Sequence, residues 1–400
     1  MTADHFIPFF VPSIEENAIR EVVETLRSGW ITTGQRCFQF EREFQDYVGA
    51  QTALAVSSCT AGLHLALTAL GIGPGDEVIT TPLTFCATAN VIVQTGAKPV
   101  LADIGDDFNI DPDAIRSRIT RNTRAIVPVH VAGLPCDLQA IWGLAREYGL
   151  KVVEDAAHAV GAQYQGMQIG AGMSDAVAFS FYANKNLTTG EGGMITSPVP
   201  ELTERMRILS LHGINKDAWR RYSREGTWYY EVTDCGFKYN LPDILAAIGI
   251  HQLRKLDEMT ARRIDIARAY KCAFSEMPEI ELPPDRSDSR HCWHLYMLRL
   301  QLNSLDVDRD TFFSEMRAQG VGCSVHFIPI QLHPYYRKLM DSDPCPRSLA
   351  EYRRLISIPL YPAMTDADVN HVIAAVKNVV TKCKKRKLFF VPQVVGQTLS

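Results

Sequence analysis

Short apolar runs rich in β-branched residues alternate with longer segments of helical periodicity along the first half of the chain. The runs are Thr52–Val56, Glu77–Thr80, Pro99–Ala102, Arg124–Val129 and Lys151–Val153. Strands that alternate with helices in this way are typical of an α/β fold. Because the runs are almost continuously apolar, they predict a mainly parallel sheet whose two faces are both covered by helices.

The segment between the first two runs shows the clearest helical pattern. Its apolar positions follow the spacing i, i+3, i+4 and i+7, at Leu63, Ala66, Leu67 and Leu70. This spacing predicts an amphipathic helix. Gly71 and Gly73 follow directly and predict its C-terminal end.

A second type of pattern begins at Pro242, which suits the first turn of a helix. From Ile244 to about Phe274 the helical pattern contains no further proline and only one glycine. This predicts one long or bent helix that bridges two domains. We therefore expect a large domain over residues 1–250 and a smaller one over residues 251–400, with the N-terminal segment packed against the smaller domain.

The pattern after this helix is less regular. We expect a strand around 295–302, a helix after Asp308, a strand around 325–330 and a helix that begins at Thr365. Asp368 stands three residues after Thr365 and completes a variant of the capping box. The last segment, 388–400, fits either a strand or a loose tail.

The composition is that of a folded enzyme rather than a disordered protein. The chain has 400 residues, of which 46% are hydrophobic, enough for a large core. Its 41 Lys and Arg against 45 Asp and Glu give a net charge of -4 without a long block of either sign, so it lacks the positive footprint of a nucleic-acid-binding protein. The most basic stretch, Lys382–Lys387, is interpreted as a solvated helix end.

The sequence also limits the compartment and the class of cofactor. The first residues lack the basic and apolar regions of a secretory signal, and no run reaches the roughly 18 apolar residues of a membrane span. The ten cysteines are scattered without a C-x-x-C pair, so neither a zinc site nor a disulfide framework is expected. We expect a cytoplasmic protein without a metal centre, whose cysteines mostly act as small buried hydrophobic residues.

A candidate anion site lies where the first predicted strand meets the following helix. The segment Ser57–Gly62 places the hydroxyls of Ser58 and Thr60 beside the first N–H groups of that helix. Exposed N–H groups and the positive end of the helix dipole bind anions. Serine and threonine are also common N-caps without any ligand, so this segment alone leaves both interpretations open.

Two acids and a histidine follow another predicted strand, at Glu154, Asp155 and His158. They lie at the carboxyl end of the strand, which is the edge where open α/β sheets bind ligands. Either acid also fits a helix cap or a salt-bridge partner, and we interpret Glu154 in this structural way.

Lys185 ends an apolar run and precedes a segment rich in glycine. The run delivers this lysine into a loop of small polar residues, and Gly192 and Gly193 permit a tight return. A lone lysine is usually a surface charge, but a lysine in such a position can instead be partly buried, which lowers the pKa of its amine and allows it to attack carbonyls. A phosphate site, a carboxylate and a lysine at one sheet edge match the needs of pyridoxal phosphate (PLP), which must be anchored, protonated at its ring nitrogen and bound as a Schiff base.

Taken together, these motifs resemble the DegT/StrS family of sugar aminotransferases. The resemblance runs from about Phe9 to Val379, and its motifs are Gly29–Gly34, Ser57–Ala61, Glu154–His158, Ser180–Gly193 and Gly236–Asn240. Because a histidine follows Glu-Asp-Ala-Ala, the chain is most similar within the family to the branch of UDP-4-amino-4-deoxy-L-arabinose aminotransferase. The resemblance implies the PLP-dependent transferase fold type I: a large α/β domain with a mixed, mainly parallel sheet, a smaller C-terminal α+β domain, and a homodimer with active sites at the subunit interface.

The resemblance also implies roles in catalysis. Lys185 would bind the cofactor covalently and shuttle a proton between the substrate carbon and the cofactor. Asp155 would pair with the ring nitrogen, and His158 would contact the ring or its phenolic oxygen. Phe85 would stack on the opposite face of the ring, with a core aromatic as the alternative interpretation.

Further residues are implied as contacts to the phosphate and the substrate. The phosphate would be held by Cys59, Thr60 and Ser180, and by Asn240 of the partner subunit. The sugar side would involve Trp30, Thr32 and Tyr182, with His326 near the active site and Glu191 beside the lysine loop. Lys216, Arg220 and Arg221 would offer cations to a diphosphate, with a solvated loop as the alternative for the two arginines.

We therefore predict a PLP-dependent aminotransferase that converts the keto group of a nucleotide-linked sugar, at C4, to an amine, and the resemblance implies glutamate as the donor. One alternative is an aminotransferase of a cyclitol or a ketosugar without a nucleotide. Another is a catalytically inactive PLP-binding regulatory protein. A dinucleotide-binding protein is excluded because no Gly-x-Gly-x-x-Gly follows the first strand. A dehydratase of the same family is disfavoured because its lysine is replaced by histidine.

Overall fold

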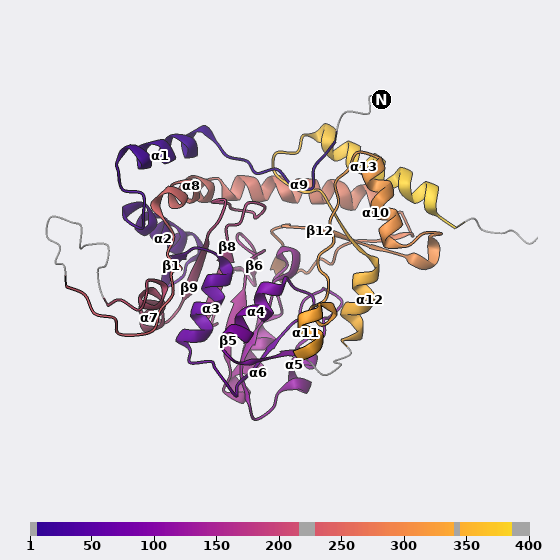
Figure 1. The fold of residues 1–400 in the computed structure, drawn as a ribbon. Coiled ribbons are helices and arrows are strands. Elements are labelled where there is room, and N and C mark those ends of the chain that lie inside the picture. Colours follow the sequence, from indigo (N-terminus) through magenta and orange to yellow (C-terminus); the bar gives the residue numbers. More distant parts are fainter. Residues whose placement is uncertain (1–5, 216–228, 340–344, 386–400) are drawn as a thin grey trace, which may run out of the picture.

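The computed structural model describes residues 6–215, 229–339 and 345–385 of the chain. Figure 1 shows a large sheet flanked by helices and a smaller sheet with helices of its own. Three groups of residues discussed above lie outside the described residues. They are Lys216 with Arg220 and Arg221, the end of the basic stretch, and the segment 388–400.

The helices and strands have the following bounds. The helices are α1 (Glu16–Arg27), α2 (Gln35–Val48), α3 (Cys59–Ala69), α4 (Cys86–Gln94), α5 (Pro112–Arg118), α6 (Leu138–Tyr148), α7 (Pro200–Ser210), α8 (Asp243–Arg254), α9 (Leu256–Phe274), α10 (Arg309–Ala318), α11 (Pro334–Leu339), α12 (Pro346–Arg354) and α13 (Asp366–Cys383). The strands of the large sheet are β1 (Thr52–Val56), β2 (Glu77–Thr80), β3 (Lys98–Leu101), β4 (Thr123–Val127), β5 (Lys151–Asp155), β8 (Ala176–Ser180) and β9 (Gly193–Ser197). The short strands are β6 (Gln163–Tyr164), β7 (Met167–Gln168), β10 (Ile280–Glu281), β11 (Ser289–Arg290), β12 (Tyr296–Leu300) and β13 (Leu355–Ile358).

The large sheet has seven strands in the order β1-β9-β8-β5-β4-β2-β3. β9 pairs antiparallel with both of its neighbours, whereas the other neighbouring strands pair in parallel. The predicted mixed, mainly parallel sheet is therefore confirmed. Each of the five strands expected between residues 52 and 153 is present, with ends that differ by at most two residues from the prediction.

Side chains of the large sheet alternate between two hydrophobic cores, one on each face. Ala53 and Ala55 of β1 pack in a core with α2, α6 and α8. Leu54 and Val56 of the same strand pack in a second core with α3, α4 and α7. The prediction that helices cover both faces is confirmed by this alternation.

The helix α3 lies where it was predicted, but it is not amphipathic. Leu63, His64 and Leu65 point in different directions around the helix, and all three are buried. The reason is that α4 and α7 pack against α3 in addition to the strands of the sheet. The apolar spacing therefore located the helix correctly but did not reveal how deeply it is buried.

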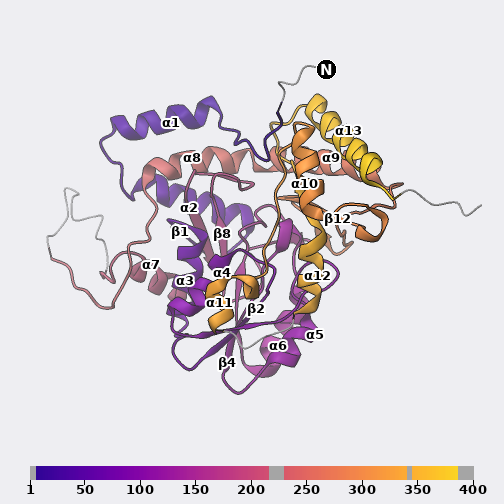
Figure 2. The ribbon, with the colours of Figure 1, turned by 45° about the vertical axis from the view of Figure 1, so that its right-hand side comes forward.

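The long helix predicted from Ile244 to Phe274 is present as α8 and α9, which meet at Lys255. Figures 1 and 2 show the two helices running end to end from the side of α2 toward the smaller sheet. The predicted bent helix is therefore confirmed. Pro242 stands at the N-cap of α8, just before the first turn in which it was expected.

The smaller sheet, in the order β10-β12-β13, forms a third core with α9, α10 and α13. Ile7 belongs to the same core, and its N–H donates a hydrogen bond to the Gly320 carbonyl at 2.8 Å. The N-terminal segment thus packs on the elements around the smaller sheet. The helix that begins after Thr365 has the predicted capping box with Asp368, and Asp308 caps α10. The division of the chain into domains at residue 250 stays a prediction.

The strand predicted around 325–330 is wrong. The chain pairs with β13 only at Ser324, whose N–H donates to the Ser357 carbonyl at 3.0 Å. It then leaves the sheet, and the Ile330 N–H donates to the Pro82 carbonyl at 2.9 Å instead. Pro329, which has no N–H to donate, also disfavours a central strand at this position. The missed partner of β12 is β13, from Leu355 to Ile358.

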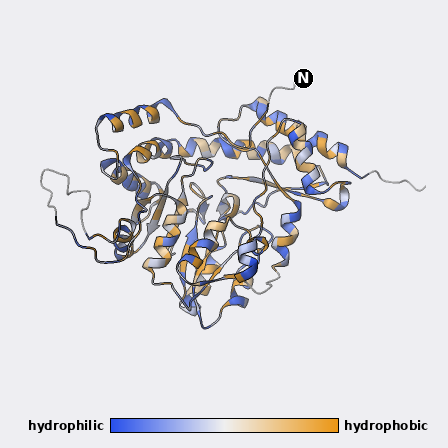
Figure 3. Cartoon of the chain, viewed as in Figure 1, coloured by the Kyte–Doolittle hydropathy of each residue, from blue (hydrophilic) through white to orange (hydrophobic). Residues whose placement is uncertain are grey.

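Hydrophobic residues concentrate around the large sheet, whereas α1 and α13 alternate between hydrophobic and hydrophilic positions (Figure 3). Over the described ranges, no helix combines the length and the apolar character that crossing a membrane requires. The same residues contain no group of three His, Cys, Asp or Glu side chains suited to a metal ion.

Two helix glycines give opposite expectations for stability. A Cβ on Gly249 of α8 would lie 2.6 Å from the ring of Phe40, which itself packs against Phe181 at 5.3 Å and cannot move aside. We expect Gly249→Ala to lower the free energy of unfolding by about 1–3 kcal/mol through overpacking. Gly143 of α6 has open space around it, so Gly143→Ala should raise that free energy by about 0.5–1 kcal/mol. Thermal and urea unfolding of both variants measures the difference, and equal effects would contradict the packing of α2 on α8.

Candidate active site

One cavity of about 640 Å³ opens at the carboxyl edge of the large sheet. The residues singled out from the sequence that line it are Cys59, Thr60, Phe85, Asp155, His158, Ser180, Tyr182, Lys185, Glu191 and His326. The fold therefore brings together residues from distant parts of the sequence. They meet at the edge where open α/β sheets bind ligands.

The N-terminus of α3 forms the anion-binding side of the cavity. Ser58 is the N-cap, and its hydroxyl accepts a hydrogen bond from the Ala61 N–H at 3.0 Å. The N–H groups of Cys59 and Thr60 have no partner within the helix, so they are available to an anion. Ser180, at the end of β8, lines the same cavity. Ser58 thus acts as the cap, while its neighbours provide the anion site.

Gly193 explains how β9 can run so close to this anion site. A Cβ at this position would lie 2.7 Å from the backbone nitrogen of Cys59 and 2.7 Å from the Phe179 carbonyl oxygen. Only a residue without a side chain allows such an approach of two backbones. The tight return predicted from Gly192 and Gly193 therefore depends on the close packing of two backbones at Gly193, which leaves no room for a side chain.

Asp155 presents a buried carboxylate at the end of β5. Its Oδ2 accepts a hydrogen bond from Thr88 Oγ1 at 2.8 Å, and its Oδ1 accepts one from the Ala157 N–H at 3.1 Å. The thiol of Cys59 lies 3.8 Å from Oδ1. All of these neighbours are donors, an arrangement that suits a carboxylate whose role is to pair with a protonated nitrogen.

Lys185 stands in the loop between β8 and β9. Burial lowers the pKa of its amine to about 8, although the nearby charge of Asp155 and the thiol of Cys59 act in the opposite direction. An amine with this pKa is neutral in a substantial fraction of molecules near neutral pH. The neutral amine is the form that attacks a carbonyl.

Three histidines surround Lys185 in uncharged form. The ring of His158 lies 4.3 Å from that of His294 and is stacked on Phe327 at 5.7 Å. Burial, and then the charge of Lys185, hold the pKa of His158 well below its ordinary value. Burial lowers the pKa of His326 to about 3 and holds that of His294 well below its ordinary value. The Nδ1 atom of His158 is buried and has no hydrogen-bond partner among the described residues, so it can bond to a ligand.

Glu154 has the structural role that the sequence suggested. The Nδ1 atom of His130 accepts a hydrogen bond from the Cys136 N–H at 3.0 Å, so the proton of the neutral ring is on Nε2. That Nε2 donates to Glu154 Oε2 at 2.8 Å. Glu154 therefore pairs with His130 on the opposite face of β5 from Asp155.

Phe85 and Tyr182 lie at the mouth of the cavity. Phe85 is 62% exposed, and its ring centroid is 6.4 Å from that of Phe327. The alternative interpretation of Phe85 as a core aromatic is therefore wrong. Tyr182 is also exposed, so both rings are free to contact a ligand that enters from solvent.

Trp30, Thr32 and Asn240 do not line this cavity. The indole N–H of Trp30 donates to the Thr33 carbonyl at 3.1 Å, and the side-chain amide of Asn240 donates to Thr33 Oγ1 at 2.7 Å. The Thr32 carbonyl accepts from the Asp243 N–H at 3.1 Å. These residues form a separate corner beside the end of β1, and within a single chain they are not part of the site.

Five further residues belong to the site although the sequence did not single them out, namely Thr84, Thr88, Asn184, His294 and Phe327. Thr88 bonds to Asp155, and the other four line the cavity. Thr84 and Thr88 are four residues apart and follow a predicted strand, and this spacing could have identified them as neighbours on a helix. No sequence pattern could have identified His294 and Phe327, because only the docking of the smaller sheet brings them to the large sheet.

The residues of the cavity fit PLP. The helix terminus with Thr60 and Ser180 would hold its phosphate, Asp155 its ring nitrogen and Lys185 its aldehyde carbon. The unpaired Nδ1 of His158 is a polar atom that lacks a partner in the chain itself, as expected where a ligand completes the site.

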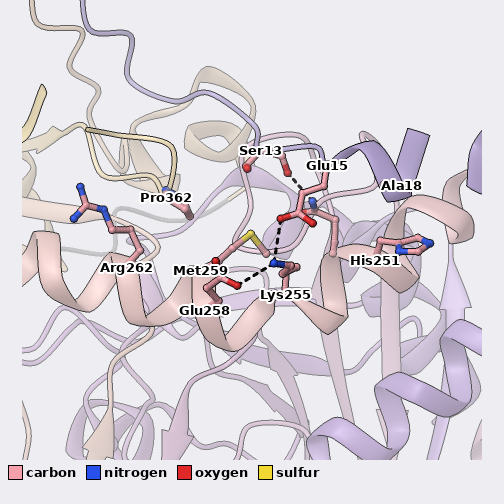
Figure 4. A pocket seen from close by; sticks show the side chains of 10 residues that line it. Ser13, Glu15, Ala18, His251, Lys255, Glu258, Met259, Arg262 and Pro362 are labelled. Atoms are coloured by element: carbon pink, nitrogen blue, oxygen red, sulfur yellow. Dashed lines mark hydrogen bonds and ion pairs between the residues drawn. The ribbon is translucent and has the colours of Figure 1, made fainter. Parts of the chain in front are cut away.

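A second cavity, of about 310 Å³, lies between the N-terminal segment and the junction of α8 and α9 (Figure 4). Lys255 Nζ lies 3.4 Å from Glu15 Oε1 and 3.0 Å from Glu258 Oε2, and Arg262 pairs with Asp366 at 2.8 Å. Because these charges neutralise one another and none of the residues with candidate chemistry is present, we assign the active site to the larger cavity.

Comparisons with known proteins find relatives that match almost the whole chain. The model of the DegT/DnrJ/EryC1/StrS aminotransferase family matches residues 12–377. The spore coat polysaccharide biosynthesis protein SpsC of Bacillus subtilis is 50% identical over 381 residues, which are 94% of this chain and 98% of SpsC. Spr1654 of Streptococcus pneumoniae, assigned as a sugar aminotransferase and solved in its PLP-form, is 34% identical with a TM-score of 0.87, covering 94% of this chain and 99% of its own. PseC of Helicobacter pylori, an aminotransferase involved in the biosynthesis of pseudoaminic acid, is 28% identical with a TM-score of 0.88, covering 95% and 100%.

The lowered pKa of Lys185 predicts how the apoprotein reacts with aldehydes. The neutral fraction of an amine with a pKa of about 8 rises from about one tenth at pH 7 to about nine tenths at pH 9. The rate at which PLP is captured at Lys185, read by borohydride trapping and mass spectrometry, should rise with a midpoint near pH 8. In Asp155→Ala the midpoint should fall, because the carboxylate that favours the charged amine is gone. Exposed Lys98 in the same samples is the control, and a midpoint above about pH 10 for Lys185 would contradict its burial.

Proposed function

The chain belongs to the DegT/DnrJ/EryC1/StrS aminotransferase family and is a PLP-dependent sugar aminotransferase, and from this premise we propose that its amino acceptor is the C4 keto group of a nucleotide-linked sugar. We further propose glutamate as the amino donor. The observation that carries the proposal is the meeting of the Lys185 amine, the Asp155 carboxylate and the helix terminus of α3 in one cavity. The branch of UDP-4-amino-4-deoxy-L-arabinose aminotransferase stays a prediction from the sequence.

The chemistry is divided among a few side chains. PLP, when bound, supplies an aldehyde and an electron-withdrawing ring, through which an amino group is taken from one molecule and given to another. We assign to Lys185 Nζ the removal and return of the proton at the reacting carbon, because its lowered pKa suits a general base and acid near neutral pH. Asp155 balances the positive charge of the ring nitrogen. His158 stays neutral and orients the ring without placing a second positive charge beside Lys185.

The shape of the cavity suits a sugar that extends into solvent. Its volume of about 640 Å³ lies within the range of roughly 300–1,000 Å³ typical of small-molecule sites, and Phe85 and Tyr182 at its mouth are exposed. The named relatives support a sugar substrate: SpsC acts in spore coat polysaccharide biosynthesis, and PseC in the biosynthesis of pseudoaminic acid. The inner part would take the keto carbon, and the nucleotide would lie toward the mouth.

A second subunit would supply what the cavity of one chain lacks. Among the described residues that line it, Lys185 carries the only ammonium or guanidinium group, so a diphosphate would need cations from elsewhere. We assign this role to Lys216 and Arg220 from the sequence alone, and the second phosphate contact to Asn240 of the partner subunit.

Two features support a homodimer in the cytoplasm. Ile19, Val23 and Leu26 form an apolar stripe on α1 that is exposed in the single chain, as expected where a second copy packs. No disulfide joins the ten cysteines, all of which lie within the described residues, and this suits a reducing compartment.

A panel of nucleotide-linked 4-ketosugars with glutamate tests the proposed substrate. We expect the wild-type protein to convert at least one of them to the aminosugar, read by product mass. Lys185→Ala should form no product, because no other described residue that lines the cavity carries an amine. The same ketosugar without its nucleotide is the control for substrate class. Equal turnover of the free sugar would favour the cyclitol or free-sugar alternative, and native turnover by Lys185→Ala would overturn the mechanism.

Mixing two inactive variants tests the shared active site. Lys185→Ala and Asn240→Ala remove residues that we place on different subunits of one site. After joint unfolding and refolding in equal amounts, half of the dimers are mixed, and one of the two sites in each mixed dimer is intact. Activity should therefore recover to about one quarter of the wild-type value. If the mixture stays inactive while each variant folds and dimerises, the two residues belong to the same subunit's site.

A further inference from the structure

Two threonines connect the wall of the cavity to the carboxylate of Asp155. Thr84 precedes α4 and lines the cavity, and Thr88 lies one helical turn later. Their hydroxyl oxygens are 2.9 Å apart, and Thr88 Oγ1 lies 2.8 Å from Asp155 Oδ2. All three side chains are at least nine-tenths buried, so no solvent competes for these bonds. The result is a chain of two hydrogen bonds that ends on Asp155.

The direction of the two hydrogen bonds follows from the chemistry of the groups. An ionised carboxylate only accepts, so the hydroxyl proton of Thr88 points to Asp155. The only proton left between the two threonines is that of Thr84, so Thr84 donates to Thr88 Oγ1. Because hydrogen bonds in a chain polarise one another, the bond from Thr84 strengthens the one from Thr88 to Asp155.

A purely local role for Thr88 is the alternative. Its hydroxyl also lies 3.3 Å from the Phe85 carbonyl, a bond that would only support the first turn of α4. The contact to Asp155 is half an ångström shorter and ends on a charged acceptor, and charge-assisted bonds are the stronger ones. The hydroxyl of Thr88 therefore donates to Asp155 Oδ2 rather than to the Phe85 carbonyl.

We propose that Thr88 and Thr84 are positioning residues that orient the Asp155 carboxylate toward the ring nitrogen of the cofactor. This inference rests on the role of Asp155 in the proposed function. The carboxylate is held by Thr88 on Oδ2 and by the Ala157 N–H on Oδ1, so its plane cannot rotate. Loss of the Thr88 bond would release one oxygen and leave it buried without a donor.

The test compares three isosteric variants by the dissociation constant of pyridoxamine phosphate, measured by equilibrium dialysis. Loss of a hydrogen bond to a charged group changes an equilibrium constant by about tenfold or more, so Thr88→Val should weaken binding by about tenfold. Thr84→Val should weaken it by about threefold, because the direct bond to Asp155 remains. Thr80→Val is the matched control, since Thr80 is equally buried and donates to the Val127 carbonyl at 2.8 Å, away from the site. It should leave binding unchanged.

The double variant Thr84→Val/Thr88→Val and the conservative Thr88→Ser make the test specific. If the two hydroxyls act in series, the double variant should bind no more weakly than Thr88→Val alone. Thr88→Ser restores the hydroxyl and should recover the affinity. The pH at which the visible absorption of bound PLP changes should shift in Thr88→Val and return in Thr88→Ser, whereas a merely structural role would not move it.

Three results would overturn the proposal. The first is wild-type affinity of Thr88→Val for pyridoxamine phosphate. The second is that Thr84→Val weakens binding of pyridoxamine phosphate equally in the wild-type protein and in Thr88→Val, which would mean that Thr84 contacts the ligand directly. The third is a failure of Thr88→Ser to recover affinity in a folded protein.

The variant Asp155→Asn separates this inference from the proposed function. If it binds pyridoxamine phosphate like the wild-type protein, the proposed role of Asp155 itself is wrong. If it binds weakly while Thr88→Val does not, only the proposed role of the two threonines is wrong.

Discussion

The buried amine of Lys185 is the constraint on which the arrangement of the site depends. Burial disfavours its charged form, and Asp155 offsets this only in part, so that the pKa lies at about 8. A shift of this size corresponds to roughly 3 kcal/mol against the charged amine. The loop that carries it must therefore be held in place by other contacts. The Asn186 side chain donates to the Cys292 carbonyl at 3.0 Å, and the Thr188 N–H donates to Gln252 Oε1 at 3.4 Å.

The reversal from β8 to β9 places this loop beside the anion site. β9 is the antiparallel strand of the large sheet, and it returns directly past the N-terminus of α3. The return is possible because Gly193 has no Cβ to collide with the backbone of Cys59. The distance between the amine and the phosphate contacts is therefore set by strand order and by one glycine.

The smaller sheet completes the cavity from the other side. His294 and Phe327 come from the segments around that sheet, and they pack against His158. Arg299 of β12 ties the two parts together, since its guanidinium lies 4.0 Å from the ring centroid of Phe108 and bonds to Glu281 at 2.6 Å. The imidazoles of the site thus remain uncharged because both parts of the structure bury them.

The sequence by itself determined the local elements and the chemistry that each carries. Periodicity located the five strands expected between residues 52 and 153 to within two residues, and it located the capping box at Thr365, because these patterns depend on near neighbours. Strand ends likewise placed Asp155 and Lys185 at one sheet edge. Only the tertiary structure decided that α3 is buried all round, that the segment 325–330 leaves the sheet, and that Thr88 and His294 reach Asp155 and His158. These contacts join residues from elements that pack together only after the chain has folded, and no short-range pattern records which distant elements will meet.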